Sequence, residues 1–224
     1  MNKRGLPFLK GLLGLFLFYF IQIGFQVVFL NILLKDNLLV NNILLIIMEL
    51  IMVFVFTLMN YKKLKNDYPD FNENYKKYLK LGFKYWLIGV GIMALSNLII
   101  AGITGGIASN ESSVRESLMK YPVYMILSTI IFAPFVEELT FRGNFKEAFK
   151  NDYLFVIFTA FLFSAVHVLN GISSPLELLY FIPYGALATS FGLTYVKTNN
   201  IYTTMVLHSL HNTFSIVLII LTSL

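Results

Sequence analysis

Residues 125–145 read MILSTIIFAPFVEELTFRGNF, an apolar stretch interrupted by two adjacent acids, Glu137 and Glu138, and by Arg142. A charged side chain at the centre of a bilayer costs about 2.5–3.5 kcal/mol even on the lenient insertion scale. Such residues inside a membrane helix are therefore expected to serve a function or to pair with one another. Glu138 and Arg142 are four residues apart, which places them on one helix face, where they can form an ion pair.

This stretch belongs to a chain whose composition is that of a membrane protein. Of its 224 residues, 57% are hydrophobic and 13% are charged, and the mean hydropathy is +0.72. An ordinary soluble domain carries about 25% charged residues. Cysteine is absent, which excludes disulfides and thiolate metal sites. The net charge of +5 follows membrane topology and does not indicate nucleic-acid binding.

Seven segments are long and apolar enough to span a bilayer, which takes about 20 residues. They cover residues 8–34, 39–60, 81–105, 122–148, 153–170, 177–197 and 201–223. We therefore predict an all-α bundle of about seven transmembrane helices, which forms one membrane domain over residues 1–224. Three spans occupy residues 1–105, and the last four lie within residues 120–224, which we expect to form the core that holds the functional site. The polar stretch 61–80 is predicted to be a loop.

Lysine and arginine positions in the flanks of the spans predict the orientation. With the N-terminus inside, only Lys35, Arg115 and Lys120 of the 17 lysines and arginines fall on the outer side. The basic stretch 61–84 contributes most to the inner side. We therefore predict a multi-pass protein of the cell membrane with a cytoplasmic N-terminus.

All three histidines also lie in predicted spans, His167 in the fifth and His208 and His211 in the seventh, where Asn212 follows. Counted from the inner ends of their spans, these groups and Glu137 lie at depths of about 10–21 Å. We therefore predict that they share a water-filled pocket in the cytoplasmic half of the membrane. His211 is expected to support these residues without taking part in the reaction itself.

The residue types in this pocket suit the hydrolysis of an amide. A carboxylate and an imidazole aimed at one water can act as a general base. A second histidine beside an asparagine amide supplies two hydrogen-bond donors, as an oxyanion hole requires. No G-x-S-x-G serine elbow is present, so the common nucleophiles have no candidate. Pro134, just before the acids, is predicted to kink the helix and free backbone carbonyls near the site.

Three motifs occur in order along the chain. EELTFR (137–142) fits E-E-x-x-x-R, FSAVH (163–167) fits F-x-x-x-H, and HSLHN (208–212) fits H-x-x-x-N. Together they resemble the CAAX protease and bacteriocin-processing family, also called CPBP or Abi, over about residues 120–220. The resemblance implies an all-helical fold and a glutamate-type intramembrane endopeptidase. Its substrate would be a lipidated or hydrophobic peptide or protein, and it would use no metal or other cofactor.

The resemblance also implies a role for each motif. Glu137 and His167 would activate water, while His208 and Asn212 would stabilise the tetrahedral oxyanion. The ion pair predicted beside Glu137 would orient that first group. Bacterial relatives process peptides or confer immunity to bacteriocins. The small size and the Lys-, Asn- and Ile-rich composition suggest a bacterial member in the plasma membrane.

Other interpretations stay open from the sequence. Glu137, His167 and His208 are also suitable zinc ligands, although no H-E-x-x-H motif is present. A non-catalytic immunity or scaffold protein would keep the pocket without turnover, with a membrane sensor kinase or a peptide-export protein as partner. Glu49, in the middle of the second span, is expected either to line the pocket or to pair with a buried base.

Overall fold

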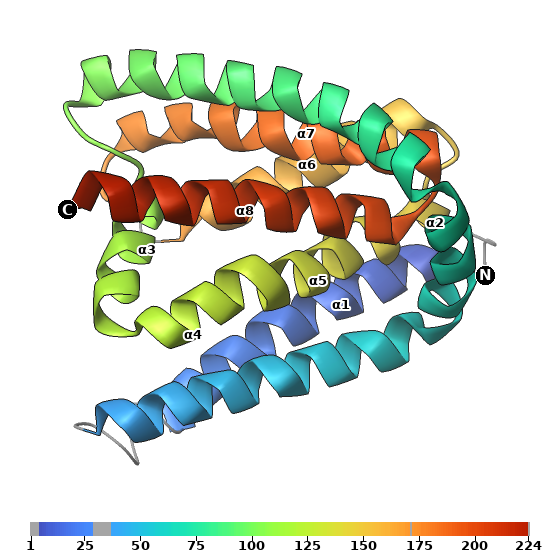
Figure 1. The fold of residues 1–224 in the computed structure, drawn as a ribbon, viewed down its shortest axis with the longest axis horizontal. Coiled ribbons are helices and arrows are strands. Elements are labelled where there is room, and N and C mark those ends of the chain that lie inside the picture. Colours follow the sequence, from blue (N-terminus) through green and yellow to red (C-terminus); the bar gives the residue numbers. More distant parts are fainter. Residues whose placement is uncertain (1–4, 29–36, 171, 224) are drawn as a thin grey trace.

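The computed structural model describes residues 5–28, 37–170 and 172–223, and in these residues the only regular elements are helices. The long helices are α1 (Gly5–Phe25), α2 (Leu38–Thr104), α6 (Asp152–Leu169), α7 (Phe181–Thr198) and α8 (Ile201–Ser223). The shorter ones are α3 (Ser109–Lys120), α4 (Pro122–Leu127), η2 (Ser128–Phe132), α5 (Ala133–Glu138), η3 (Leu139–Gly143), η4 (Lys146–Ala148) and η5 (Pro175–Tyr180). The helices pack side by side as a bundle (Figure 1), and the predicted all-α membrane fold is confirmed.

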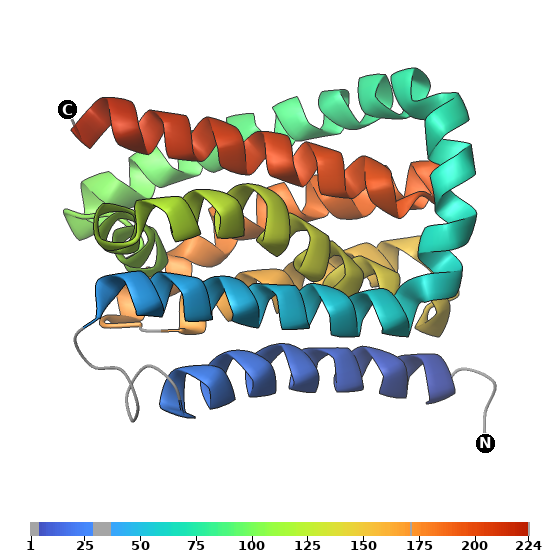
Figure 2. The ribbon, with the colours of Figure 1, turned by 60° about the horizontal axis from the view of Figure 1, so that its bottom comes forward.

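Six helical stretches of the described chain are long and apolar enough to cross a membrane. Seven segments are predicted, and the difference lies in α2, where 39–60 and 81–105 belong to one helix of 67 residues. Figure 2 shows α2 running along the bundle, turning across one end and returning. Its backbone leaves helical geometry at Asn60, with φ −119° and ψ 15°. The first predicted segment is described as far as Val28, and Lys3, Arg4 and Lys35 lie outside the described residues.

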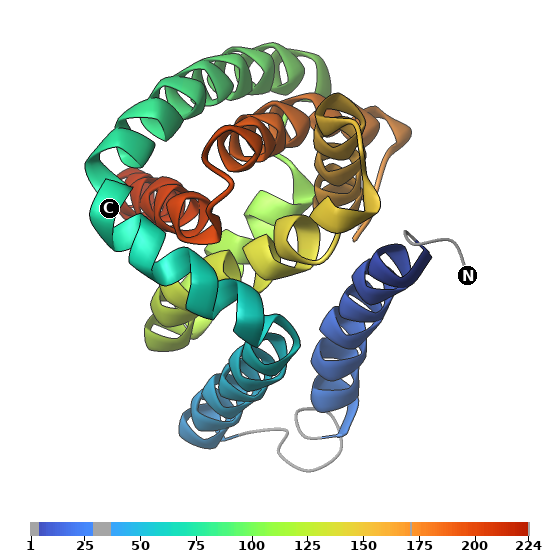
Figure 3. The same ribbon diagram turned by 90° about the vertical axis from the view of Figure 1, so that its right-hand side faces the viewer.

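The polar stretch 61–80 is helical and forms the middle of α2, so the predicted loop is wrong. Its acids are bound to the turn between α7 and α8. Asp67 Oδ2 accepts a hydrogen bond from the Ile201 amide at 2.9 Å, and Asp70 Oδ2 accepts one from Asn200 Nδ2 at 2.9 Å. Figure 3 shows this part of α2 crossing the end of the bundle. The polarity that suggests a loop belongs to a helix that lies across that end with much of its surface exposed.

The two ends of the bundle differ in the segments that they carry. We call the end with residues 61–80 and the α7–α8 turn the basic end, because it holds most of the lysines. We call the opposite end, with α3 and η5, the α3 end. Figure 1 shows the N-terminus toward the basic end and the C-terminus toward the α3 end.

The fourth predicted span, 122–148, is a series of short pieces instead of one straight helix. Two of them, η2 and η3, are π-helical, and Pro134 is the second residue after the end of η2. Proline has no N–H to donate to the carbonyls of the preceding turn. The predicted disturbance of the helix before the acids is therefore present, and it takes the form of a π-helical turn.

Candidate active site

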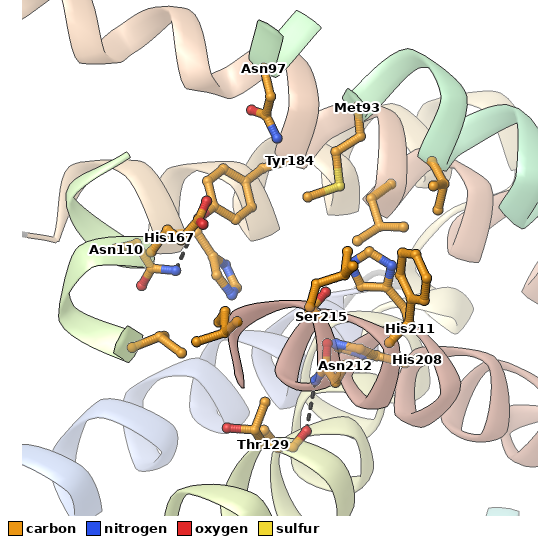
Figure 4. Close-up of a pocket in the computed structure, with 18 of the residues that line it drawn as sticks. Met93, Asn97, Asn110, Thr129, His167, Tyr184, His208, His211, Asn212 and Ser215 are labelled. Atoms are coloured by element: carbon orange, nitrogen blue, oxygen red, sulfur yellow. Dashed lines mark hydrogen bonds between the residues drawn. The ribbon is translucent and has the colours of Figure 1, made fainter. Parts of the chain in front are cut away.

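One cavity of about 460 Å³ is lined by several polar residues of the bundle. The predicted water-activating and oxyanion residues all line it: Glu137 from α5, His167 from α6, and His208 and Asn212 from α8. In Figure 4 the His167 ring points into this space from one side, and His208 and Asn212 lie across from it. Three helices that are separate in the sequence thus contribute to one site.

Glu137 presents a carboxylate oxygen with no partner. The side chain is 13% exposed, and within residues 5–28, 37–170 and 172–223 no group hydrogen-bonds its Oε2. His208 Nε2 lies 3.9 Å from this oxygen, which is too long for a hydrogen bond. A buried acceptor without a donor is costly. The position therefore suits a water or a substrate N–H.

His167 is held in one tautomer by its own helix. Its Nδ1 lies 2.8 Å from the Phe163 carbonyl oxygen. Because a carbonyl only accepts, Nδ1 carries the proton, and Nε2 of the neutral ring is an acceptor. The ring stacks on Phe163, with centroids 4.2 Å apart, and packs against Tyr184 at 5.1 Å. His167 thus presents an oriented hydrogen-bond acceptor on the wall of the cavity.

Glu138 and Arg142 form the predicted ion pair, with Arg142 Nη1 3.0 Å from Glu138 Oε1. Both are fully buried and do not line the cavity. The same Oε1 lies 2.9 Å from His208 Nδ1, and Arg142 Nη2 donates to the Ala188 carbonyl at 3.0 Å. The resemblance implies that this pair orients Glu137. In the structure Glu138 hydrogen-bonds His208 instead, so the ion pair positions His208, which is predicted to serve the oxyanion.

Asn212 is oriented by the broken fourth span. Its Nδ2 donates to the Thr129 carbonyl at 2.7 Å, and Ser209 Oγ donates to the Ile130 carbonyl at 2.6 Å (Figure 4 marks the first bond). These carbonyls belong to the turn that Pro134 leaves without a backbone donor. An amide nitrogen has two hydrogens, so Nδ2 keeps one for a ligand in the cavity.

His211 also lines the cavity and is 6% exposed. Its ring makes edge contacts with Trp86 and Phe191, at centroid distances of 6.4 and 6.5 Å. In the described part of the chain its Nδ1 has no hydrogen-bond partner. His211 therefore lines the cavity beside His208. The prediction that it supports the site without lining the cavity is wrong.

Sequence reasoning missed several polar residues of the cavity. Asn97 of α2, Tyr184 of α7, and Asn110, Glu111 and Arg115 of α3 all line it. Asn110 Nδ2 donates to the Tyr184 hydroxyl at 3.0 Å, which ties α3 to α7. The 106–121 segment lacks the hydrophobicity of a span, and nothing in it signals that it folds over the cavity.

Glu49 neither lines the cavity nor pairs with a base, so both expectations for it are wrong. It is 5% exposed, and its Oε1 accepts hydrogen bonds from Ser128 Oγ at 2.6 Å and from the Tyr124 hydroxyl at 3.3 Å. Hydroxyl donors therefore satisfy this carboxylate inside the bundle, where a basic partner was expected.

The cavity extends toward one end of the bundle. The cavity extends to Asn110 and Arg115 of α3 and to Leu218 near the end of α8, all at the α3 end. The prediction of a pocket in the cytoplasmic half depends on the orientation of the bundle in the membrane, and it stays a prediction. Depth counted along a helix locates each polar group, but it cannot tell in which direction the space around that group continues.

The zinc interpretation needs three donor side chains around one point. Across the described ranges, no three His, Asp or Glu side chains come together in a way that could hold a metal ion. The donor geometry therefore gives that interpretation no support.

The chain is similar to a family of membrane peptidases and to several curated bacterial proteins. A family model described as "Type II CAAX prenyl endopeptidase Rce1-like" matches residues 119–214. The relative "UPF0177 protein YvdC" of Lactococcus lactis is 30% identical over 62% of this chain and 56% of its own length. "Putative membrane peptidase YdiL" of Bacillus subtilis is 25% identical over 61% of this chain and 53% of its own. No solved structure matches the chain significantly.

The chain spans about half the length of the curated relatives that it matches. The family match nevertheless covers α5, α6 and most of α8, and with them every polar residue described above as a motif position. This match and these relatives support a membrane peptidase of the CAAX protease (CPBP) type.

Proposed function

We propose that this protein is an intramembrane endopeptidase that hydrolyses a peptide bond in a lipidated or hydrophobic peptide. The observation that carries the proposal is the unpaired Oε2 of Glu137 on the wall of the cavity that His167 also lines. A water between the two groups would find two acceptors for its two protons. The family match supports a membrane protease in general, and the water-activating pair is the specific claim.

In the proposed reaction, Glu137 accepts and returns a proton, and His167 Nε2 accepts a hydrogen bond. Glu137 takes a proton from the water, whose oxygen attacks the carbonyl carbon and forms a tetrahedral intermediate. His167 Nε2 accepts the second hydrogen bond and fixes the direction of attack. Glu137 then returns its proton to the amide nitrogen, the C–N bond breaks, and a carboxylic acid and an amine leave.

The negative oxygen of the intermediate needs donors. Asn212 Nδ2 offers the hydrogen that Thr129 does not use. His208 can donate from Nε2 when both ring nitrogens carry a proton. Its Nδ1–H then donates a hydrogen bond to Glu138 Oε1, 2.9 Å away. Removing one oxyanion-hole donor from a serine protease costs about 10²–10³ in kcat, and a loss of this order is expected here.

The proposal includes a place in the cell, the bacterial plasma membrane. The N-terminus and the basic end lie on the cytoplasmic side. The excess of lysine along residues 61–84 supports this orientation by the positive-inside rule.

The first test is cleavage by the purified protein in detergent. The reporter is a mixture of hydrophobic peptides, and new termini are detected by mass spectrometry. Glu137→Gln keeps the shape of the side chain and removes the base, so cleavage should fall at least about 10²-fold, the lower range for general base catalysis. Glu73→Gln, at an exposed position of α2, is the matched control and should cleave like the parent.

His167→Ala should be similarly impaired because the water loses its second acceptor. Full activity of both Glu137→Gln and His167→Ala would refute the mechanism. A non-catalytic scaffold makes a different prediction. In a host that depends on this protein, Glu137→Gln should then complement fully.

A further inference from the structure

The cavity is closed toward the basic end. The residues that follow Glu137 are buried, and Glu138 and Arg142 are 0% exposed. Beyond them lies the largest hydrophobic cluster, whose fully buried members near this end are Leu139, Phe145, Phe155, Tyr195 and Ile201. None of these side chains lines the cavity. A substrate from the basic end would have to displace this packed core.

The crossing part of α2 reinforces this closure. The Leu64 carbonyl accepts a hydrogen bond from the Tyr202 hydroxyl at 3.3 Å, and the Asp67 carbonyl accepts one from Asn200 Nδ2 at 2.8 Å. Leu64 itself is buried in the same hydrophobic cluster. The basic end is thus covered by a helix that is bonded to the start of α8.

The other side of the cavity is open along a seam between the returning arm of α2 and α8. Phe214 and Leu218 of α8 line the cavity, yet they are 47% and 44% exposed. Val90 and Met93 of α2 line it from the opposite side. Figure 4 shows Met93 and Asn97 facing Ser215 of α8 across the space. Exposed lining residues mark the place where the cavity meets its surroundings.

The walls change in character along this seam. Toward the middle of the bundle they are apolar. At the α3 end they carry Asn110 and the ion pair of Glu111 and Arg115, whose N–O distance is 2.7 Å and whose side chains are about a third exposed. Such a surface suits an extended peptide with an apolar segment in the seam and a polar or charged segment at α3.

Charge tells the two ends apart. The described α3 end carries Arg115 and Lys120, which are accompanied by Glu111 and Glu116 in the same helix. The basic stretch of α2 carries many more cations, namely Lys62, Lys63, Lys65, Lys76, Lys77, Lys80 and Lys84. The positive-inside rule puts such a stretch in the cytoplasm and the α3 end outside.

We propose that the substrate reaches the Glu137 site from the outer face of the membrane, through the α3 end and the seam between α2 and α8. The substrate is therefore an exported peptide with an apolar segment. A protein that is modified and retained in the cytoplasm does not reach this side. The substrate part of this proposal rests on the proposed peptidase function, whereas the direction of the opening does not.

The absence of cysteine allows a direct test by single cysteine substitutions. Lys76→Cys reports the basic end and Ser113→Cys reports α3, and both positions are exposed. Asn97→Cys and Ser215→Cys report the cavity from its two walls. Each variant is treated in intact cells with a membrane-impermeant maleimide, and again after permeabilisation, and is then purified and scored for the label.

The expected result is labelling of Ser113→Cys and of at least one cavity variant in intact cells, with Lys76→Cys labelled only after permeabilisation. The reverse pattern would place the opening in the cytoplasm and overturn the proposal. Labelling of Ser113→Cys in intact cells without either cavity variant would also overturn it, because the cavity would then be closed to the outside. Glu137→Gln in each background should leave the labelling unchanged, so this test does not depend on catalysis.

Proteoliposomes test the substrate class. Labelling of Ser113→Cys and Lys76→Cys first establishes which face is exposed, and a hydrophobic peptide is then added to the outside only. Vesicles that expose the α3 end should cleave it, and those that expose the basic end should not. A matched peptide in which serines replace the apolar segment should be cleaved at least about tenfold more slowly. Equal cleavage from both faces, or of both peptides, contradicts the proposal, and cleavage from neither face contradicts the peptidase function.

Discussion

At the residue scale, the buried charged side chains make a series of contacts that ends at the cavity. Arg142 neutralises Glu138, and Glu138 holds His208. Taking both charges out of water is costly, and it is tolerated because each has a partner at hydrogen-bond distance. Breaking such a pair leaves a lone buried charge, whereas a solvated pair of the same spacing loses little.

Arg142→Ala should therefore lower the free energy of unfolding by about 3–5 kcal/mol. The matched control is Arg115→Ala, which removes an ion pair of the same i,i+4 spacing from a more exposed place and should cost about 0.2–1 kcal/mol. Both are measured by reversible unfolding of the purified protein in mixed detergent micelles. Equal losses for the two variants would show that the buried pair is not a structural requirement.

At the element scale, η2 links a buried acid, Glu49, to Asn212 in the cavity. Glu49 binds Ser128 at the start of η2, and the next residue, Thr129, accepts the hydrogen bond of Asn212. Pro134 explains why carbonyls are available in this turn. Glu49 explains why the turn stays in place, since its carboxylate joins η2 to the first arm of α2.

Glu49→Ala should lower the free energy of unfolding by about 1–3 kcal/mol because it leaves the buried Ser128 hydroxyl without its acceptor. Asn42→Ala is a control on the same arm, where the lost hydrogen bond is exposed and local, to the Leu38 carbonyl. In a double-mutant cycle, Glu49→Ala and Ser128→Ala should couple by about 0.5–3 kcal/mol. Additive effects would mean that the 2.6 Å contact contributes nothing.

At the scale of the whole molecule, the returning arm of α2 defines one wall of the site, and its position depends on close packing against α7. A Cβ on Gly89 would lie 2.9 Å from Ser190 Cβ and 3.2 Å from the Ala186 carbonyl oxygen. A Cβ on Gly91, two residues on, would meet no atom within 4 Å. Glycine thus permits a near approach of the two helices at one position and is unconstrained at the other.

Gly89→Leu should be less stable than Gly91→Leu by about 1–3 kcal/mol, the usual cost of overpacking. Helix propensity and hydrophobicity change equally in the two variants, so the difference isolates the steric term. Thermal unfolding followed by circular dichroism in detergent measures it. If both variants unfold at the same temperature, the arm does not pack against α7 in solution as it does in the structure.

Local spacing predicted the part of the site that lies within single helices. The i,i+4 relation of Glu138 and Arg142 is an example, because helix geometry alone brings these residues together. The partner of Glu138 on α8 was not predictable in this way. It depends on the axial position of α8 relative to α5, and many such positions would satisfy the same hydrophobic pattern. The helical nature of 61–80 was missed for a related reason, since its acids find their partners in residues 200 and 201.

The sequence by itself determined that this chain is a membrane bundle, which polar residues lie inside its apolar segments, and which of them share a helix face. Those properties follow from composition and from the fixed period of the α-helix. Only the tertiary structure decided that the ion pair of Glu138 and Arg142 contacts His208, that Glu49 hydrogen-bonds η2, and that the cavity extends toward α3. These depend on contacts between segments far apart in the chain, and the hydrophobicity of a single segment carries no information about which neighbour it faces.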